Sequence, residues 1–392
     1  MKVITLKSGR EKSALSRHPW VFSGAVQFAE ENIQPGESVL VYDSKGTILG
    51  SAAFSSSSSI RARFWNFSGE VVDRNFIENR IRSAISARGT LGLDGVTNGV
   101  RLIHGESDGV PGLVVDRYAN VVSVQILSAG AEFWREDIIQ ILSDLPGVEA
   151  VVERSDADVR SLEGLESRTG VVYGRLPDQL TIQEHGINYL VDVLHGQKTG
   201  FYLDQRQNRK LVMDHAAGNS VLNCFCYTGG FGIAALKGGA KSLASLDSSA
   251  EAIELAKQNM QLNDLDPDDS EWILGDAFVQ LRRLRDMNRK FDLIVMDPPK
   301  FAPTASQAQK AARGYKDINL LALKMLNPGG LLFTFSCSGG ITAEFFRTIL
   351  FEAALDAKVD AQILHQMHQD ADHPISLNFP EGEYLKGYLI RV

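Results

Sequence analysis

The second half of the chain, from about residue 185, alternates short apolar runs with amphipathic segments. Apolar positions recur at helical spacing in the amphipathic segments, whereas the apolar runs have the length of buried strands. The predicted strands are 220–227, 242–247, 272–276, 291–299, 331–338 and 383–392, and the predicted helices are 229–239, 249–263, 315–330 and 342–355. Strands and helices that alternate at this spacing predict a mostly parallel, doubly wound α/β sheet over 185–392.

The first 70 residues have a different pattern, in which short β-type runs are separated by turns. The segment 37–54 reads as two strands around a turn at Asp43–Gly46, and 60–65 reads as another strand. We expect a small β-rich unit of the barrel type over 1–70, which is too short for a catalytic core.

Residues 72–183 mix the two patterns and predict an α+β middle domain. One helix is expected over 73–89, ended by Gly89, and a second over 132–147, closed by Pro146–Gly147. The first helix carries its apolar positions at helical spacing: Phe76, Ile77, Ile81, Ala84 and Ile85. The residues of this domain indicate no particular chemistry.

The composition is that of an ordinary globular protein, with 44% hydrophobic and 22% charged residues. A length of 392 residues predicts two or three domains. No apolar run approaches the roughly 20 residues of a membrane span, and the start is too polar for a signal peptide. Three cysteines without zinc-type spacing favour a reducing, cytoplasmic setting without disulfides or metal.

The net charge of −8 weighs against non-specific binding of nucleic acid, but the basic residues are unevenly distributed. One basic cluster lies within residues 1–20 and a second is the run 281–290. Local basic patches can bind phosphate on an acidic protein. A solvated surface explains each patch equally well, so both interpretations stay open.

Four polar or reactive side chains fall at the carboxyl ends of predicted strands. Asp247, Asp276, Asp297 and Cys337 each end or directly follow an apolar run. Because doubly wound sheets bind ligands at the carboxyl ends of their strands, we expect these side chains to meet at one edge.

The run YTGGFG, 227–232, follows the first of these strands and opens a helix. Glycine there lets the backbone approach a ligand, while the departure from GxGxxG disfavours a nicotinamide dinucleotide. An acidic residue one strand later, Asp247, can hold two ribose hydroxyls. The alternative role for Asp247 is to cap the helix that begins near Ala250.

The run DPPK, 297–300, follows a buried strand, and its prolines stiffen the backbone. We expect it to present Asp297 and nearby carbonyls to a flat polar group such as a nucleobase; a plain strand-ending turn is the alternative. Cys224 and Cys226 lie in the first strand and are expected to be core residues. Cys337 ends its strand and is either a nucleophile or another buried small side chain; a neighbouring helix N-terminus would favour its thiolate.

Taken together, these motifs resemble those of class I S-adenosylmethionine-dependent methyltransferases. The likeness extends through the whole chain to the bacterial large-subunit ribosomal RNA cytosine-5 methyltransferase I family. It rests on these runs: GQKTGFYLDQRQNR (196–209), YTGGFG, DPPKFAPTASQAQKAARGYKDINLLAL (297–323), FTFSCSGG (333–340) and DHPISLNFPEGEYLKGY (372–388). The N-terminal unit resembles a PUA domain, an RNA-binding barrel.

The resemblance implies S-adenosylmethionine as cofactor, large-subunit ribosomal RNA as partner, and roles for individual residues. The methionine part of the cofactor would be covered by Lys198, Phe201, Tyr202, Asp204 and Arg206, with Tyr227, Gly229 and Gly230 on its other side. Asp247 would hold the ribose, Asp276 the adenine amino group and Asp297 the target base, with Cys337 as the nucleophile. Asp297 stands where several RNA cytosine-5 methyltransferases have a second cysteine, so the base that removes the carbon-5 proton stays open between Asp297 and a water.

The sequence leaves several alternative functions open. They are methylation of an exocyclic amine of guanine or adenine, methylation of uracil at carbon 5, and an RNA-binding assembly factor without turnover. The residue pattern determines neither the modified nucleotide, nor whether naked RNA or an assembled particle is the substrate, nor the oligomeric state, for which a homodimer is one option.

Overall fold

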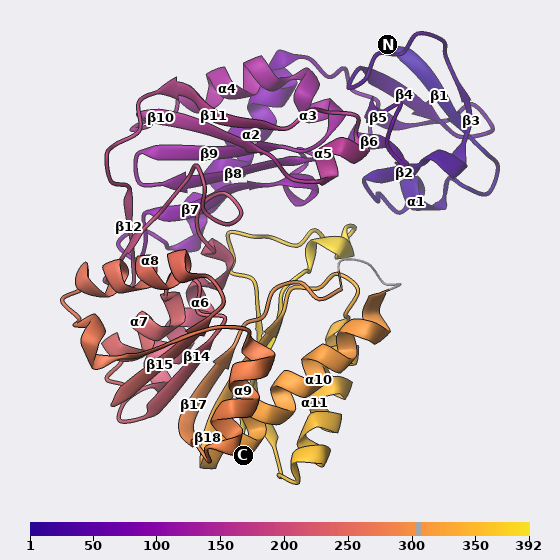
Figure 1. The fold of residues 1–392 in the computed structure, drawn as a ribbon. Helices are drawn as coiled ribbons and strands as arrows, with labels where there is room; N and C mark the ends of the chain where they lie inside the picture. Colours follow the sequence, from indigo (N-terminus) through magenta and orange to yellow (C-terminus); the bar gives the residue numbers. More distant parts are fainter. Residues whose placement is uncertain (303–306) are drawn as a thin grey trace. The chain divides into compact units, whose positions relative to one another are not determined.

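The computed structural model describes residues 1–302 and 307–392, which form two compact units. The first unit comprises Met1–Ile182, Val191–Leu203 and Ala371–Gly382. The second comprises Gln183–Leu190, Asp204–Asp370 and Glu383–Val392. Figure 1 shows the first unit mainly in indigo to magenta and the second mainly in orange to yellow.

The beginning of the first unit is a six-stranded sheet with the strand order β2-β6-β5-β4-β1-β3. Alternate apolar residues such as Val39 and Val41 are fully buried on one face, as period-2 patterning requires. The elements are β1 (Lys2–Leu6), α1 (Lys12–Leu15), β2 (Trp20–Phe22), β3 (Val26–Ala29), β4 (Ser38–Tyr42), β5 (Ile48–Phe54) and β6 (Ile60–Asn66). The structure therefore adds β1–β3 to the strands that the sequence predicted.

A five-stranded sheet with the order β11-β10-β9-β8-β7 completes the first unit. Its core includes the apolar face of α2, where Ile77 and Ile81 are fully buried and Ile85 packs at the margin. The elements are α2 (Arg74–Arg88), β7 (Gly99–His104), β8 (Leu113–Tyr118), β9 (Val121–Ile126), α3 (Ala129–Phe133), α4 (Arg135–Ser143), β10 (Ala150–Ser155), α5 (Val159–Leu162) and β11 (Arg168–Gly174). The single helix expected over 132–147 is instead two helices that meet at Trp134.

The second unit is built on a seven-stranded sheet with the order β16-β15-β14-β17-β18-β20-β19. The first five strands in this order are parallel, and β20 is antiparallel to β18. The strands are β14 (Ser220–Cys224), β15 (Ser242–Asp247), β16 (Glu271–Leu274), β17 (Phe291–Met296), β18 (Leu326–Ser336), β19 (Gln362–His368) and β20 (Lys386–Arg391). A two-stranded sheet of β12 (Thr181–Glu184) and β13 (Ile187–Leu190) precedes it in the chain.

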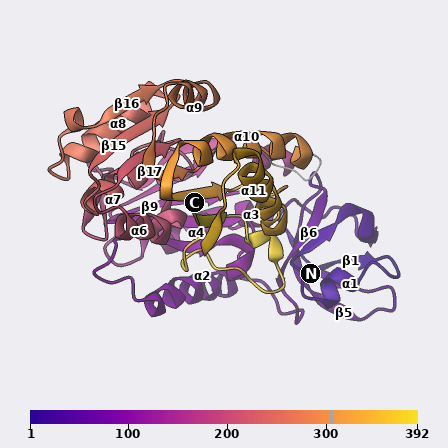
Figure 2. The same ribbon diagram turned by 90° about the horizontal axis from the view of Figure 1, so that it is seen from below.

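Helices cover both faces of this sheet, because alternate strand residues point to opposite sides. Leu222 and Ile294 pack in one core cluster with α9, α10 and α11, and Val221 and Leu293 pack in another with α6 and α7. Figures 1 and 2 both show α10 and α11 side by side. The helices are α6 (Arg206–His215), α7 (Gly230–Lys237), α8 (Ala250–Gln261), α9 (Ala277–Asp286), α10 (Ala308–Met325) and α11 (Ala343–Ala357). The predicted mostly parallel, doubly wound sheet is confirmed.

The end of α10 differs from the sequence prediction. The helix ends at Met325 rather than at Pro328–Gly329, and β18 already begins at Leu326. The reason is tertiary: Asn327 Nδ2 donates to Asp292 Oδ1 at 2.7 Å, and the Gly329 N–H donates to the Val392 carbonyl at 2.7 Å. These contacts hold 326–330 as an irregular extension of the sheet.

Candidate active site

The four predicted strand-end side chains lie at the carboxyl edge of the seven-stranded sheet. The strand order reverses between β14 and β17, which pair from Val221↔Leu293 to Cys224↔Met296. Such a reversal is where doubly wound sheets open a ligand crevice. Asp297 follows β17 at this point, Cys337 follows the neighbouring β18, and Asp247 ends β15 on the other side.

The turn after β14 has an unusual backbone. Phe225 and Tyr227 adopt positive φ angles of 57° and 46°, and Gly229 has a φ of 84° and caps the N-terminus of α7. A left-handed conformation costs a non-glycine residue about 1–2 kcal/mol, and such conformations concentrate at functional sites. Contacts with neighbouring residues must therefore hold the turn in this conformation.

The Asp247 carboxylate holds this turn in place. Its Oδ2 accepts from the Tyr227 N–H at 2.8 Å and its Oδ1 from the Ser249 N–H at 3.0 Å. The helix cap of α8 is Ser249, whose Oγ accepts from the Ala252 N–H, so the alternative role of Asp247 as the cap is wrong. Each carboxylate oxygen keeps one lone pair, which suits two ribose hydroxyls.

Side chains that the sequence reasoning missed support the same turn from behind. Asn259 Nδ2 donates to the Thr228 carbonyl at 2.9 Å, and the Tyr189 hydroxyl donates to the Gly230 carbonyl at 3.2 Å. Arg209 forms a buried two-pronged ion pair with Glu184, at 2.7 and 2.6 Å.

The glycines at the turn pack closely against their neighbours. A Cβ on Gly230 would lie 3.1 Å from Arg209 Cδ, and one on Gly229 would lie 3.0 Å from Ala256 Cβ. Such contacts are tighter than ordinary van der Waals distances, and Gly229 also needs its positive φ. Because these two residues have no side chain, the backbone of the turn lies close to its neighbours and would be open to a ligand.

Asp276 lies after β16 and caps the N-terminus of α9. Its Oδ1 accepts from the Val279 N–H at 3.0 Å, and the residue is exposed. The cap occupies one carboxylate oxygen, which leaves the other for an amino group. Its predicted contact with adenine stays a prediction.

Asp297 is partly buried, and its carboxylate is oriented by the side chain of Gln205, the residue directly before α6. Gln205 Nε2 donates to Asp297 Oδ2 at 3.0 Å, and Gln205 Oε1 accepts from Asn208 Nδ2 at 2.6 Å. The second hydrogen bond fixes which way the Gln205 amide points, since its oxygen is already engaged. Gln205 and Asn208 lie within the run 196–209. Their hydrogen-bonded connection to Asp297 is visible only in the folded structure.

The three cysteines differ as expected, with one correction. Cys224 and Cys226 are buried, and burial raises the pKa of both thiols. Cys224 lies in β14, but Cys226 lies beyond its end, in the turn. Cys337 is partly exposed, and its Sγ lies 4.0 Å from the Pro298 carbonyl oxygen, directly after Asp297. The structure therefore brings Cys337 and the DPPK run together.

Ser338 connects the segment after Asp297 to the end of β18. Its buried Oγ accepts from the backbone N–H groups of Phe301 and Ala302, both at 3.0 Å. The Tyr315 hydroxyl of α10 lies 2.9 Å from the same oxygen. This hydroxyl holds the loop after the paired prolines beside Cys337. Residues 303–306 of the matching run lie outside the described residues.

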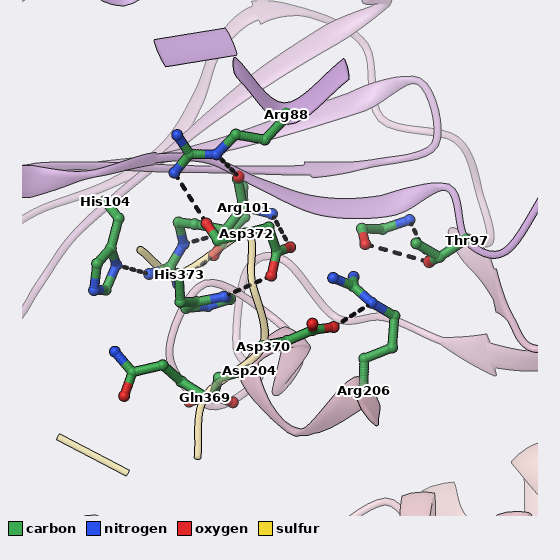
Figure 3. Close-up of polar contacts among 12 residues, drawn as sticks. Arg88, Thr97, Arg101, His104, Asp204, Arg206, Gln369, Asp370, Asp372 and His373 are labelled. Atoms are coloured by element: carbon green, nitrogen blue, oxygen red, sulfur yellow. Dashed lines mark hydrogen bonds and ion pairs between the residues drawn. The ribbon is translucent and has the colours of Figure 1, made fainter. Parts of the chain in front are cut away.

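Asp204 and Arg206 are almost completely buried in the second unit. Arg206 Nε pairs with Asp370 Oδ2 at 2.6 Å, and Figure 3 shows the two side chains pointing toward one another. Asp204 Oδ2 accepts from the Tyr384 hydroxyl, and its carbonyl accepts from the Asp370 N–H at 3.0 Å. Their predicted contact with the cofactor stays a prediction beside this structural role.

Lys198, Phe201 and Tyr202 belong to the first unit. Lys198 has a positive φ of 55°, and its Nζ lies 4.3 Å from the centroid of the Tyr202 ring. Phe201 is buried, and its N–H donates to the Tyr118 hydroxyl at 3.1 Å. Their predicted place over the methionine moiety is untested.

The segment Ala371–Gly382, which contains DHPISLNF, also belongs to the first unit. Asp372 Oδ2 accepts from the Arg101 N–H at 2.9 Å, and the Asp372 carbonyl accepts from Arg88 Nη2 at 2.9 Å (Figure 3). His373 Nδ1 lies 2.9 Å from Asp372 Oδ1. The buried contacts with Arg101 and Arg88 anchor the segment to β7 and to α2.

The donor set of the second unit fits S-adenosylmethionine. Carboxylates end the adjacent strands β15 and β16, and the tight turn follows β14. Among residues 1–302 and 307–392, no group of His, Cys, Asp or Glu could hold a metal ion. No helix in the described part of the chain is long and apolar enough to cross a membrane.

Comparison with known proteins agrees with this assignment. A family model described as S-adenosylmethionine-dependent methyltransferase matches residues 166–379, and one for a PUA-like domain matches residues 4–67. A solved structure from Streptococcus mutans, described as a candidate S-adenosylmethionine-dependent methyltransferase, aligns over 100% of both chains with a TM-score of 0.85 at 22% identity. The fold and site thus define a class I S-adenosylmethionine-dependent methyltransferase with an N-terminal PUA-like domain.

Relatives of much higher identity narrow this class. Ribosomal RNA large subunit methyltransferase I of Klebsiella pneumoniae is 49% identical over 391 residues, which are 99% of this chain and 98% of the relative. The protein of that name from Aeromonas hydrophila is 50% identical over 392 residues, again 99% and 98% of the two chains. The chain belongs to the ribosomal RNA large subunit methyltransferase I family.

Proposed function

We propose that this protein methylates carbon 5 of a cytosine in large-subunit ribosomal RNA through a covalent intermediate on Cys337. The named relatives support ribosomal RNA as the substrate. The observation that carries the chemistry is the partly exposed thiol at the end of β18, with its Sγ 4.0 Å from the carbonyl that follows Asp297.

A thiol is what this reaction needs, because carbon 5 of cytosine is a poor nucleophile. The Cys337 thiolate forms a bond to carbon 6, which makes carbon 5 enamine-like. Bound S-adenosylmethionine supplies an electrophilic methyl group, which carbon 5 takes as S-adenosylhomocysteine leaves. A base then removes the carbon-5 proton, the 5,6 double bond forms again, and the carbon–sulfur bond breaks to release the thiolate.

Asp297 is proposed to face the ring edge of the target base. Gln205 Nε2 donates to Asp297 Oδ2 at 3.0 Å and orients the carboxylate, which is proposed to accept a hydrogen bond from the exocyclic amino group of cytosine. That contact distinguishes cytosine from uracil, which offers a carbonyl at the same position. Asp297 and a water remain the two candidates for the proton-removing base.

The N-terminal PUA-like domain is proposed to bind the RNA. A pocket of about 420 Å³ in this domain is lined by the basic residues Arg10 and Lys12 and the aromatic residues Trp20 and Phe22. Guanidinium and ammonium groups attract phosphates, and aromatic rings stack on bases. The run 281–290 is a weaker candidate, because Arg282 and Arg289 in it pair with Asp317 and Glu271.

The target cytosine must leave its stack to reach a thiol at a sheet edge, at a cost of a few kcal/mol. Binding of flanking RNA by the PUA-like domain offsets this cost. Single-stranded or already unstacked cytosines are therefore the expected targets.

A covalent trap tests the proposal. Ribosomal RNA that contains 5-fluorocytidine is incubated with the protein and S-adenosylmethionine and then run on a denaturing gel. Fluorine cannot leave as a proton does, so the carbon-6 adduct persists and shifts the protein band. The shift is expected with the wild type and with Cys224→Ala, and it is expected to be absent with Cys337→Ala.

Other outcomes assign the alternatives. Methyl transfer that persists in Cys337→Ala, without a trapped band, contradicts the thiol mechanism and indicates an exocyclic amine as the acceptor. A band with 5-fluorouridine RNA but not with 5-fluorocytidine RNA indicates uracil instead. Failure to bind S-adenosylmethionine would point to an assembly factor without turnover.

A further inference from the structure

Lys386, at the start of β20, is a buried lysine that the proposed reaction does not use. Its side chain is 6% exposed, although lysine is among the residue types that are almost never fully buried without a partner. Its Nζ donates to the Ser338 carbonyl at 3.1 Å. This hydrogen bond satisfies one of the three donors of an ammonium group.

Lys386 contacts the residues on either side of Cys337. In the antiparallel pairing of β18 and β20, Ser336 lies opposite Lys386, and the Lys386 side chain reaches the carbonyl of Ser338. The residue between these two contacts is Cys337. The ammonium group is therefore held at the backbone next to Cys337, where burial lowers the pKa of Lys386 and the charge of a thiolate acts to raise it.

Charged and titratable groups around Lys386 come from three segments. Cys337 follows β18, Glu383 precedes β20, and Lys300 belongs to the DPPK run. Glu383 and Lys300 are exposed, so water screens their effect, whereas Cys337 is partly buried. No carboxylate in the described part of the chain lies within ion-pair distance of Lys386 Nζ.

The physical balance at Lys386 follows from these neighbours. Burial lowers the pKa of Lys386, and Lys300 acts in the same direction, while Cys337 and Glu383 oppose the change. An interaction in which a thiolate stabilises an ammonium group is reciprocal, so the ammonium group stabilises the thiolate equally.

We propose that Lys386 is a positioning residue that favours the thiolate form of Cys337 and fixes the backbone on which that thiolate is presented. The inference rests on the proposed role of Cys337 as the nucleophile. The ammonium group keeps its proton throughout: the thiol releases its own proton to solvent, and the positive charge compensates the sulfur. When the sulfur bonds to carbon 6, the negative charge of the sulfur moves to the cytosine ring. The Lys386 ammonium group then has no thiolate charge beside it until the carbon–sulfur bond breaks.

The test measures the thiol itself rather than turnover. Cys224 and Cys226 are buried, so alkylation of the folded protein by iodoacetamide reports on Cys337, with Cys337→Ala as the blank. The rate follows the thiolate fraction and rises with pH to a plateau. The pH at half of the plateau is then compared among wild type, Lys386→Met, Lys386→Arg and Lys300→Met.

Loss of the buried positive charge in Lys386→Met should move this midpoint upward by about one pH unit, which is about a tenfold slower reaction at a fixed pH below it. Lys386→Arg keeps the charge and should keep most of the wild-type profile. Lys300→Met is the matched control, because it removes an exposed charge that acts on Lys386 and should shift the midpoint much less. An unchanged midpoint in folded Lys386→Met overturns the proposal.

A measurement on the unmodified residues guards against a variant that fails to fold. Thiolate absorbance near 240 nm, taken as wild type minus Cys337→Ala across pH, should rise with a midpoint below about 8.5, the value of free cysteine. A midpoint at or above that value also overturns the proposal. If the fluorocytidine adduct forms but the alkylation profile of Lys386→Met is unchanged, Cys337 is still the nucleophile and the role of Lys386 is rejected. If the alkylation profile shifts but no adduct forms, the interaction between Lys386 and Cys337 stands and the proposed reaction is rejected.

Discussion

The carboxyl edge of the seven-stranded sheet has two halves that are held in different ways. On the half formed by β14, β15 and β16, the Asp247 and Asp276 carboxylates accept from backbone N–H groups of the adjoining turns. On the half formed by β17 and β18, Asp297 is held by the Gln205 side chain and the loop beside Cys337 by the Ser338 hydroxyl.

The difference separates what belongs to the fold from what belongs to the reaction. Backbone groups are available in any sequence that folds this way, so the first half suits a ligand shared by many enzymes. Side chains at particular positions orient the second half, which is where the proposed methyl transfer takes place. Substitutions on the first half should therefore weaken cofactor binding, and substitutions on the second half should reduce methyl transfer.

The largest effect is expected for Cys337→Ala. Methylation should fall by about 10⁴-fold or more, because loss of a nucleophile removes the covalent route. Affinity for S-adenosylmethionine, measured by calorimetry, should stay within about twofold, since Cys337 lies on the other half of the edge. Loss of cofactor binding together with activity would show that the two halves are not independent.

The converse is expected for Asp247→Asn. An amide places an NH₂ group against the N–H of Tyr227 or Ser249, and it removes the charge that is predicted to face the ribose hydroxyls. Cofactor affinity should fall about 100-fold, or about 2.8 kcal/mol. Iodoacetamide should still alkylate Cys337 at the wild-type rate.

Asp276→Asn is the matched control for that variant. Asparagine caps helices as well as aspartate does, so α9 should be unaffected. Because Asp276 is exposed, the loss of affinity should be smaller than for Asp247→Asn. Equal losses would contradict the special role given to Asp247.

Much of the parallel sheet could be predicted from sequence, because its strands are buried on both faces and read as continuous apolar runs. The edge strand β19 could not, since all but one of its residues are exposed. The end of α10 was misplaced because Asn327 and Gly329 are held by residues distant in the chain, Asp292 and Val392.

The site divides in the same manner. Alternation of strands and helices was enough to place Asp247, Asp297 and Cys337 at one edge. The sequence did not predict the hydrogen bonds around these residues. Gln205 bonds to Asp297 across 92 positions of sequence, and Lys386 bonds to Ser338 across 48. Contacts of that separation depend on strand register, which local periodicity does not encode.

A smaller effect is expected for Ser338→Ala, which sharpens the description of the second half. The substitution leaves the buried N–H groups of Phe301 and Ala302 without their acceptor, so the free energy of unfolding should fall by about 1–3 kcal/mol. Tyr315→Phe removes only one partner of the same hydroxyl and should cost less. Denaturant unfolding of the two variants measures both values, and an unchanged stability in Ser338→Ala would refute the role of this hydroxyl.

The smallest effect is expected for Cys224→Ala, which compares two thiols of the same chain. Cys224 is fully buried in β14, and burial raises its pKa, so its thiolate is scarce at neutral pH. Replacing it should lower the free energy of unfolding by about 1 kcal/mol through a small cavity and leave methylation unchanged. Intact mass after iodoacetamide treatment should show one adduct in wild type and in Cys224→Ala, and none in Cys337→Ala. A lost adduct in Cys224→Ala would mean that the reactive thiol lies in the first strand, and the proposed division of the edge would fail with it.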